Sequence, residues 1–362
     1  MSKKEKNEGT TRRDFMKIAA IGGAFLGLQS AVLPRSSEAD ASGKQMGGGG
    51  QLDTIIDFHA HVYPPSFKAV PNRPPSLFDV ERLFAQQKEA DVNTSVISYP
   101  MFGAPGKGAP PLDELKEWND FAAELTAKSK GRIVALVCTN AFGGTPFIKE
   151  VERALREGGF KGITVNSSVK GEYLDSPKAF PLYELACELD VPIFVHPPGE
   201  TPGAEKMREF RLVEMLGRPF DTTLSLARLI LFGVLERYPN LKLVAAHMGG
   251  ALPMLPGRLD FGYALRKDMT FGPWEPDVLS KPPSHYISQI YVDTMGFHPA
   301  GVLCALATVG VDHVVLGSDH PPVNIPLKRS VDVIRNLPLA EQDRKKILGG
   351  NAARLLKLQK PA

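Results

Sequence analysis

The stretch Ile55-Ile56-Asp57-Phe58-His59-Ala60-His61-Val62 carries two histidines at positions i and i+2 of an alternating, β-branched run. On a β-strand, residues two apart point to the same face. Two imidazoles on one face can both coordinate one divalent cation, at about 2 Å from each nitrogen. Paired histidines at a strand end can also be purely structural, so the interpretation depends on what the rest of the chain supplies.

Short apolar runs alternate with helical patterns after this stretch, and the helical spacing is clear in 112–125, 180–189, 224–238 and 299–309. Eight strand–helix units in about 300 residues predict an α/β fold, the (β/α)8 TIM barrel, with a doubly wound open sheet as second choice. The predicted strands are 54–62, 94–99, 133–138, 162–165, 192–196, 242–247, 290–293 and 313–319.

Potential metal ligands stand at the ends of four predicted strands. His59 and His61 end the first strand, His196 the fifth, His247 the sixth and Asp319 the eighth. The active site of a TIM barrel lies at the C-terminal ends of its strands, so these five residues would share one rim. The sequence therefore predicts a metal site at that rim.

The first 41 residues differ in composition from the rest of the chain. A lysine-rich start leads to Arg12-Arg13, the apolar run 18–28 and a small-residue cleavage site at 39–41. This order resembles a twin-arginine export signal, because a membrane span needs about 20 apolar residues. We expect an export signal in 1–41, a flexible linker in 42–52 and a barrel in 53–358. The mature protein would be periplasmic, delivered by the twin-arginine export machinery, without stable membrane insertion.

Charge and cysteine content exclude several classes of function. Beyond residue 41 the chain has 36 basic and 35 acidic residues, so no basic stripe predicts a nucleic-acid partner. Cys138, Cys187 and Cys304 are an odd, widely spaced set within apolar segments. They predict buried thiols and neither a disulfide framework nor a zinc–cysteine cluster.

Several motifs together match one family over most of residues 53–356. The sequence resembles the amidohydrolase superfamily, and within it the amidohydrolase-related subgroup typified by aminocarboxymuconate semialdehyde decarboxylase and the resorcylate decarboxylases. The motifs are Asp57-Phe58-His59-Ala60-His61, Phe194-Val195-His196-Pro197, the run 233–242, Ala246-His247-Met248-Gly249-Gly250, Leu316-Gly317-Ser318-Asp319-His320-Pro321 and Ile347-Leu348-Gly349-Gly350-Asn351-Ala352.

The resemblance implies one divalent metal held by His59, His61, His196 and Asp319. It implies His247 beside the metal as an acid/base or oxyanion stabiliser, and Asp319 can also accept a proton. Three imidazoles and a carboxylate make zinc the expected metal, with manganese or cobalt as alternatives.

Binuclear members of the superfamily bridge two metals with a lysine at the end of the fourth strand. Here that strand ends in Asn166-Ser167-Ser168, which favours one metal, although Lys170 is near in sequence.

The resemblance implies a metal-dependent enzyme that removes CO₂ without oxidation from a small unsaturated or aromatic carboxylate. Hydrolysis of a lactone, ester or amide is the alternative, and a non-catalytic binding protein on a relict barrel is the second alternative. A carboxylate substrate needs a cationic partner, and the loops after the first, second and fourth strands offer Arg73, Lys68, Lys107 and Lys170. Of these we select Arg73 as the candidate, while His320 is a second candidate for substrate contact. Related barrels commonly pair, so we expect a homodimer.

The remaining candidates have plainer interpretations. His285, His298 and His313 are expected to be structural or solvent-facing, because no other ligand type groups with them. Asp57 shares the alternation of His59 and His61, so it is either an acceptor behind a metal ligand or a buried structural carboxylate.

Overall fold

The computed structural model describes residues 54–69, 74–99, 108–268, 270, 272–321 and 325–358. The predicted export signal and linker, together with Arg73, lie outside these residues. Among the helices of the described ranges, none combines the length and apolar character that crossing a membrane requires.

Parallel strands form two hydrogen-bonded sheets, in the orders β1-β2-β3 and β4-β5-β8-β9-β10-β11. Each of the eight predicted strands is present, the third as β3 plus β4. The bounds are β1 Ile56–His61, β2 Thr94–Ser98, β3 Ile133–Ala135, β4 Val137–Cys138, β5 Ile163–Asn166, β8 Ile193–His196, β9 Leu243–Ala245, β10 Tyr291–Asp293 and β11 Val314–Val315.

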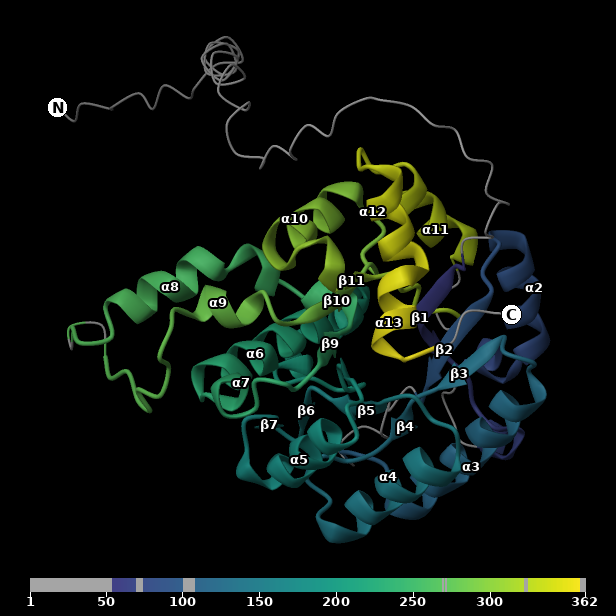
Figure 1. Cartoon of the computed structure of the whole chain (residues 1–362). Helices are drawn as coiled ribbons and strands as arrows, with labels where there is room; N and C mark the ends of the chain where they lie inside the picture. Colours follow the sequence, from purple (N-terminus) through teal and green to yellow (C-terminus); the bar gives the residue numbers. More distant parts are fainter. Residues whose placement is uncertain are drawn as a thin grey trace, which may run out of the picture. The chain divides into compact units, whose positions relative to one another are not determined.

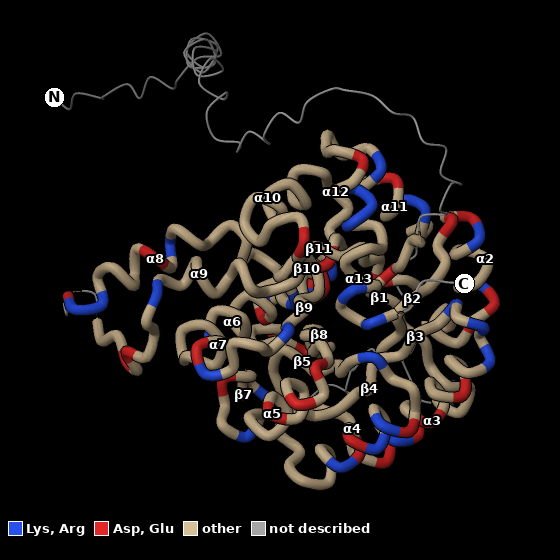
Figure 2. Tube along the Cα trace, viewed as in Figure 1, with Lys and Arg blue, Asp and Glu red and all other residues tan. Residues whose placement is uncertain are grey.

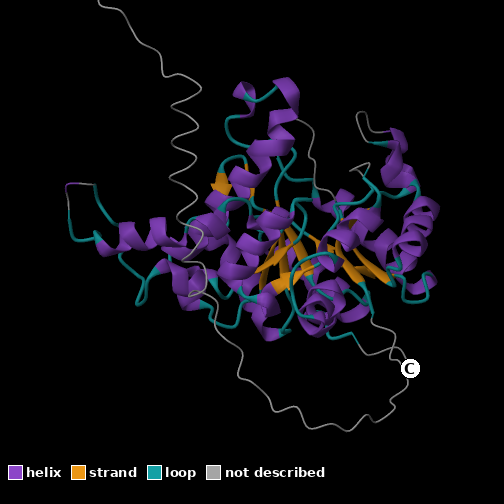
Figure 3. Cartoon of the chain, turned by 90° about the horizontal axis from the view of Figure 1, so that it is seen from above, coloured by secondary structure: helices purple, strands orange, loops and turns teal. Residues whose placement is uncertain are grey.

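Backbone hydrogen bonds join the two sheets at both of their edges. Between β3 and β4, Leu136 N still donates to Ile97 O of β2, at 3.0 Å, and the strand then pairs with β5. At the other edge Phe58 N donates to Leu316 O at 2.7 Å and Asp319 N donates to His59 O at 2.8 Å. The strands therefore close into a barrel, surrounded by helices (Figure 3), which confirms the TIM barrel over the open sheet.

Helices connect the strands and cover the outside of the barrel (Figure 1). Basic and acidic residues are interspersed along α2, α3 and α4 (Figure 2), while Val151 and Ala154 of α4 are buried in the core. The helices are α2 Val80–Ala90, α3 Leu112–Lys128, α4 Thr145–Glu157, α5 Phe180–Glu188, α6 Arg218–Leu231, α7 Val234–Arg237, α8 Pro256–Ala264, α9 Pro283–Ile287, α10 Pro299–Val309, α11 Leu327–Arg335, α12 Glu341–Lys345 and α13 Asn351–Leu355.

Two apolar cores lie on the two sides of the barrel wall. The larger core fills the space between strands and helices, and the smaller one fills the barrel interior. Near the start of the strands, Ala352 and Leu355 of α13 join the interior core. The interior is therefore packed and apolar below the strand ends, which leaves polar chemistry to the C-terminal rim.

A bulge in β1 changes which side chains face the barrel interior. From Asp57 to Ala60 β1 advances three residues, while its partner β2 advances two, from Ser95 to Ile97. Before this irregularity Phe58 belongs to the interior core, and after it Ala60 belongs to the outer core. His59 and His61 therefore face the interior, whereas Asp57 does not share their face, and the prediction that it does is wrong.

A small hairpin follows β5 and was not predicted. It consists of β6 (Ser168–Val169) and β7 (Glu172–Tyr173), which pair antiparallel. Lys170 and Gly171 form the two-residue turn with φ of 51° and 80°. Positive φ at both positions is typical of the type I′ turn that joins such short strands.

Candidate metal centre

The three strand-borne histidines use the same ring nitrogen to anchor themselves to the protein. Each Nδ1 lies within hydrogen-bond distance of an oxygen that can only accept, so Nδ1 carries the proton and Nε2 keeps a lone pair. The acceptors are Asp293 Oδ2 for His59 at 2.6 Å, Ser98 O for His61 at 3.1 Å and Pro197 O for His196 at 2.9 Å.

The lone pairs and one carboxylate converge on a common point. His59 Nε2 and His61 Nε2 are 3.0 Å apart, and Asp319 Oδ1 lies 3.4 Å and 3.1 Å from them. The ligand atoms of His59, His196, His247 and Asp319 all lie within 4.8 Å of one another. Two imidazole lone pairs at 3.0 Å have no proton to share, so a divalent cation is the partner that this donor set fits.

The electrostatics of the group suit metal binding. Burial lowers the pKa of His61 and lowers that of His196 well below its usual range, so both rings stay neutral. Burial alone would lower the pKa of His59 and raise that of Asp319. In His59 the nearby carboxylates prevail and raise the pKa, and in Asp319 the surrounding histidines prevail and hold it well below its usual range.

His247 and Asp319 sit just beyond their strands in strained backbone. Their φ angles are 55° and 57°, in the left-handed region that residues with a side chain rarely adopt. His247 Nε2 lies 3.5 Å from Asp319 Oδ2. In contrast to the three strand histidines, His247 Nδ1 has no hydrogen-bond partner within the described ranges. This ring is therefore not locked by the protein in the way that metal ligands are.

Asp293, at the end of β10, was missed as a site residue. Its Oδ2 accepts from His59, while its Oδ1 accepts from the backbone N–H of Met248 at 2.9 Å and of Met295 at 3.0 Å. One carboxylate thus fixes the His59 ring and the loop that carries His247. The available signal was its position: a carboxylate ends predicted strand 290–293 at the same rim as the histidines.

Gly317 permits the close approach of Asp293 and His59. A Cβ at position 317 would lie 2.7 Å from Asp293 Cβ and 3.1 Å from His59 Cβ. Any larger residue would have to displace one of the two side chains, which makes this glycine part of the geometry of the centre.

Asp57 is a structural carboxylate. Its oxygens accept from Ser318 N at 3.0 Å, from Ser318 Oγ at 2.6 Å and from His59 N at 3.2 Å. Burial raises its pKa to about 7. The residue ties the first strand to the segment that leads to Asp319, and the role behind His59 belongs to Asp293.

Arg218, at the first position of α6, is a second residue that sequence analysis missed. Burial lowers the pKa of its guanidinium, which the charges of Asp319, Glu214 and Tyr63 partly offset. Arg218 Nη2 lies 3.9 Å from Glu214 Oε1. The cations predicted from the sequence lie in loops after the first, second and fourth strands, whereas Arg218 follows the fifth.

The other predicted residues occupy varied positions. His320 is buried, its carbonyl accepts from His61 N, and burial together with Arg82 lowers its pKa to about 4. His298 caps α10 by accepting from Ala300 N, and His313 Nδ1 contacts Ser288 O at 2.6 Å. The substrate roles of His320 and of Arg73 stay predictions.

The model of the amidohydrolase family matches residues 56–358. This chain belongs to the amidohydrolase family. It is 31% identical over 275 residues to the 2-amino-3-carboxymuconate-6-semialdehyde decarboxylase of Dictyostelium discoideum, covering 74% of each chain. It is 27% identical to the gamma-resorcylate decarboxylase of Polaromonas sp., covering 85% of this chain and 96% of the relative.

Solved structures share the fold of this amidohydrolase. The 5-carboxyvanillate decarboxylase of Sphingomonas paucimobilis superposes with a TM-score of 0.74 at 23% identity, covering 85% of this chain and all of that one. A dihydroxybenzoic acid decarboxylase from Polaromonas, with bound manganese and 2-nitroresorcinol, gives a TM-score of 0.70 at 24% identity, covering 85% and 98%. Membership of this family, together with the convergent metal-binding atoms of this chain, identifies the protein as a metal-dependent enzyme.

Proposed function

We propose that this protein is a carbon–carbon lyase that removes CO₂, without oxidation, from a small aromatic or unsaturated carboxylate. The convergence of three imidazole Nε2 atoms and Asp319 beside an unlocked His247 carries this proposal. The resemblance to two decarboxylases over at least 74% of the chain supports the choice of reaction.

We assign one divalent ion to His59, His61, His196 and Asp319. Zinc is the expected metal, and manganese or cobalt are the alternatives, since this donor set accepts all three. When bound, the ion supplies Lewis-acid charge that orients a substrate oxygen. Asp293 and the backbone acceptors behind the histidines would hold the ligand rings in place.

The remaining groups suit the movement of one proton. In decarboxylation a proton from the His247–Asp319 pair is added to the carbon that bears the carboxylate. The bond from that carbon to the carboxylate carbon then breaks, CO₂ leaves, and the electron pair of the broken bond restores the double bond or aromatic ring. Arg218 is partly buried, which lowers the pKa of its guanidinium, and the negative charge of Asp319 raises that pKa in part, so Arg218 is the candidate partner for the anionic substrate.

Metal analysis and product identification test the proposal together. The purified mature chain should contain about one divalent metal and release CO₂ from aromatic carboxylates but open no lactone or ester. Arg218→Met should raise KM by about tenfold or more, and Arg218→Lys by less, because the planar guanidinium binds a carboxylate through two donors. Hydrolysis without CO₂ release would contradict the lyase, and full metal occupancy without any turnover would favour a binding protein.

We further propose that the enzyme is exported through a twin-arginine signal in residues 1–41. The paired arginines before a short apolar run support this assignment. Cell fractionation of wild type and of an Arg12→Lys, Arg13→Lys variant tests it. The wild type should be periplasmic and the variant should stay in the cytoplasm; an unchanged distribution would contradict the signal.

We also propose a homodimer that covers an exposed apolar surface. Phe210 is 85% exposed, Phe220 57% and Met254 77%, and a contact between two copies of the chain would remove such apolar side chains from water. Light scattering should give twice the chain mass, and Phe220→Glu should shift the population to monomer. A monomeric wild type would contradict the dimer.

A further inference from the structure

His247 stands on a backbone turn that needs support from outside. Four consecutive residues, 247–250, have positive φ, at 55°, 59°, 71° and 65°. Glycine adopts such angles readily, but His247 and Met248 carry side chains that oppose them. Residues of this kind keep their conformation only where the surrounding structure fixes it. The His247 ring gives little support, because its Nδ1 makes no hydrogen bond within the described ranges.

Two side chains hold this turn, one near each end. Asp293 accepts from the backbone N–H of Met248 at 2.9 Å. At the far end, Thr223 of α6 accepts from the backbone N–H of Ala251 at 2.8 Å. The backbone that carries His247 is therefore held by β10 on one side and by α6 on the other.

The turn packs directly against the first turns of α6. A Cβ at Gly250 would lie 2.1 Å from Pro219 O and 2.4 Å from Thr223 Oγ1. Gly250 N in turn donates to His247 O at 2.9 Å, which ties these two residues together. Thr223 Oγ1 donates its own proton to Pro219 O at 2.7 Å, so its lone pairs are available to Ala251 N. One hydroxyl thus joins the helix to the His247 turn.

The neighbouring residue, Thr222, offers a direct comparison. Its Oγ1 donates to Arg218 O at 3.1 Å, which is the same bond along the helix that Thr223 makes to Pro219 O. Within the described ranges, however, Thr222 Oγ1 makes no hydrogen bond to the 247–251 turn. The two threonines therefore differ in the contact that reaches toward His247.

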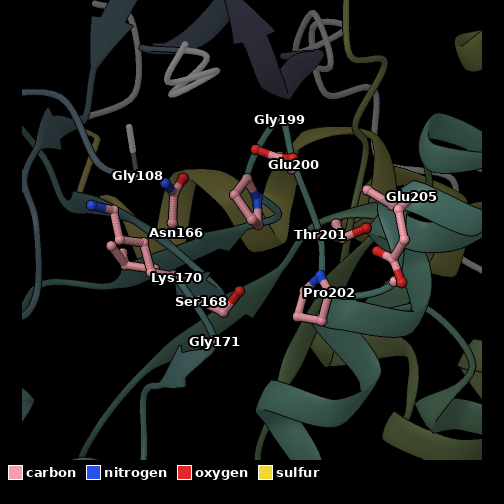
Figure 4. A pocket seen from close by; sticks show the side chains of 14 residues that line it. Gly108, Asn166, Ser168, Lys170, Gly171, Gly199, Glu200, Thr201, Pro202 and Glu205 are labelled. Carbon is pink, nitrogen blue, oxygen red and sulfur yellow. The ribbon is translucent and has the colours of Figure 1, made fainter. Parts of the chain in front are cut away.

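The same helix borders a cavity beside the metal centre. This cavity of about 390 Å³ lies between the β6–β7 hairpin and the loop after β8 (Figure 4). Asn166 in its lining pairs in register with His196 on the neighbouring strand. Ser168, also in the lining, donates to Asp221 of α6 at 3.0 Å. The helix is therefore fixed to the cavity wall as well as to the His247 turn, and it carries Arg218.

We propose that Thr223 is a positioning residue for His247. Its hydroxyl fixes the strained turn against α6, so that the His247 ring faces the site where Arg218 would bind the substrate carboxylate. Thr223 acts through the backbone of residues 250 and 251 and not through contact with the substrate. The part of His247 in the reaction rests on the proposed function, but the orientation of its ring can be measured without turnover.

Kinetics of matched variants test the proposal. Thr223→Val keeps the shape of the side chain but leaves Ala251 N–H without this acceptor. We expect kcat to fall about 10- to 100-fold, because a shift of about 1 Å in a reacting group has an effect of this size. KM should change by less than about twofold, and metal content should stay at about one per chain.

Two further variants show whether the hydroxyl is responsible. Thr223→Ser retains it and should restore kcat to within about threefold of the wild-type value. Thr222→Val should leave kcat unchanged. An equal loss in Thr222→Val would contradict the proposal, because the helix as a whole would then be the cause. A rise in KM at unchanged kcat in Thr223→Val would contradict it too, by placing Thr223 in substrate binding.

The ring itself can be followed by NMR of the zinc-loaded protein, labelled with ¹³C at histidine Cε1. The His247 signal is identified by its loss in His247→Gln. It should shift or broaden in Thr223→Val but not in Thr222→Val, while the signals of the three strand histidines stay in place. This measurement needs no substrate. A His247 signal that is the same in Thr223→Val and in the wild type would overturn the proposal.

Gly250→Ala disturbs the same junction from the other side. Its Cβ would meet Pro219 O and Thr223 Oγ1, so we expect kcat to fall at least as far as in Thr223→Val, with the metal retained. Gly144→Ala is the matched control. Gly144 has φ 72° and ψ −161°, close to the 65° and −125° of Gly250, but its Cβ would meet nothing within 4 Å. Full kcat in Gly250→Ala, or an equal loss in Gly144→Ala, would count against the proposal.

CO₂ release separates this proposal from the lyase. If the wild type releases no CO₂, the lyase is wrong, and the His247 signal alone decides whether Thr223 positions the ring. If the wild type releases CO₂ and Thr223→Val does so equally fast, the lyase stands and the positioning role of Thr223 is wrong.

Discussion

Two kinds of residue make up the rim of this barrel, and they differ in how the protein holds them. His59, His61 and His196 lie on strands, and each ring is locked through Nδ1. His247 and Asp319 lie just past their strands, at positive φ, and His247 Nδ1 has no partner in the described part of the chain. The locked rings suit metal binding, and the His247–Asp319 pair suits proton movement. Asp319 therefore belongs to both groups.

The largest effect is expected from removing a locked ligand. His196→Ala should lower the metal content from about one to near zero per chain and reduce kcat by at least about a thousandfold. Elemental analysis and CO₂ release measure both. His285→Ala changes an exposed histidine and should alter neither. Full metal occupancy in His196→Ala would contradict its assignment as a ligand.

Changing the unlocked ring should separate metal binding from activity. His247→Gln should keep about one metal per chain and lower kcat by about 10² to 10⁴, the range of a lost acid/base group. The same two assays apply. If the metal leaves with His247, then His247 is a ligand and the distinction between the two kinds of residue fails.

A smaller effect is expected from the carboxylate that locks His59. Asp293→Asn should weaken metal binding by about 10- to 100-fold, because the charged acceptor of the Nδ1 proton is lost. Competition with a chelator measures the metal Kd. Asp332→Asn on α11, an exposed carboxylate paired with Lys328, serves as the control. An unchanged Kd in Asp293→Asn would show that metal binding does not need a charged acceptor for the His59 Nδ1 proton.

The smallest effect should come from adding a methyl group beside the hydrogen bond between Asp293 and His59. Gly317→Ala places a Cβ between Asp293 and His59, and we expect the metal Kd to rise by about threefold to tenfold as the two side chains move apart. Gly257→Ala in α8 is the matched control, since its Cβ would meet nothing within 4 Å. Equal Kd values for both variants would mean that Asp293 tolerates displacement.

The fold was predictable because each strand carries its own local signal. Apolar runs of strand length, separated by helical spacing, are enough to place all eight strands, and the rim follows from the barrel itself. The β6–β7 hairpin was missed, because two-residue strands carry too little hydrophobic pattern. Its Lys170-Gly171 turn was the only local indication.

The candidate site was predictable only where the residue type and its position at a strand end indicate metal binding. Histidines at strand ends do so, and the structure brings all of the predicted ones together. Asp293 and Arg218 depend on distant neighbours, His59 and Asp319 respectively, and no local pattern records such a pairing. Of the two roles predicted for Asp57, the buried structural carboxylate is correct. Its predicted face is wrong, because strict alternation along a strand does not foresee an inserted residue.

The bulge in β1 has a consequence for anyone who would build this centre into another barrel. In an ideal strand, the spacing that points Phe58 into the interior would turn His59 and His61 toward the surrounding helices. The single extra residue lets an apolar floor and a pair of ligands occupy the same side of one short strand. Grafting the His-x-His motif alone would therefore transfer the residues without their direction; the irregular backbone must be transplanted with them.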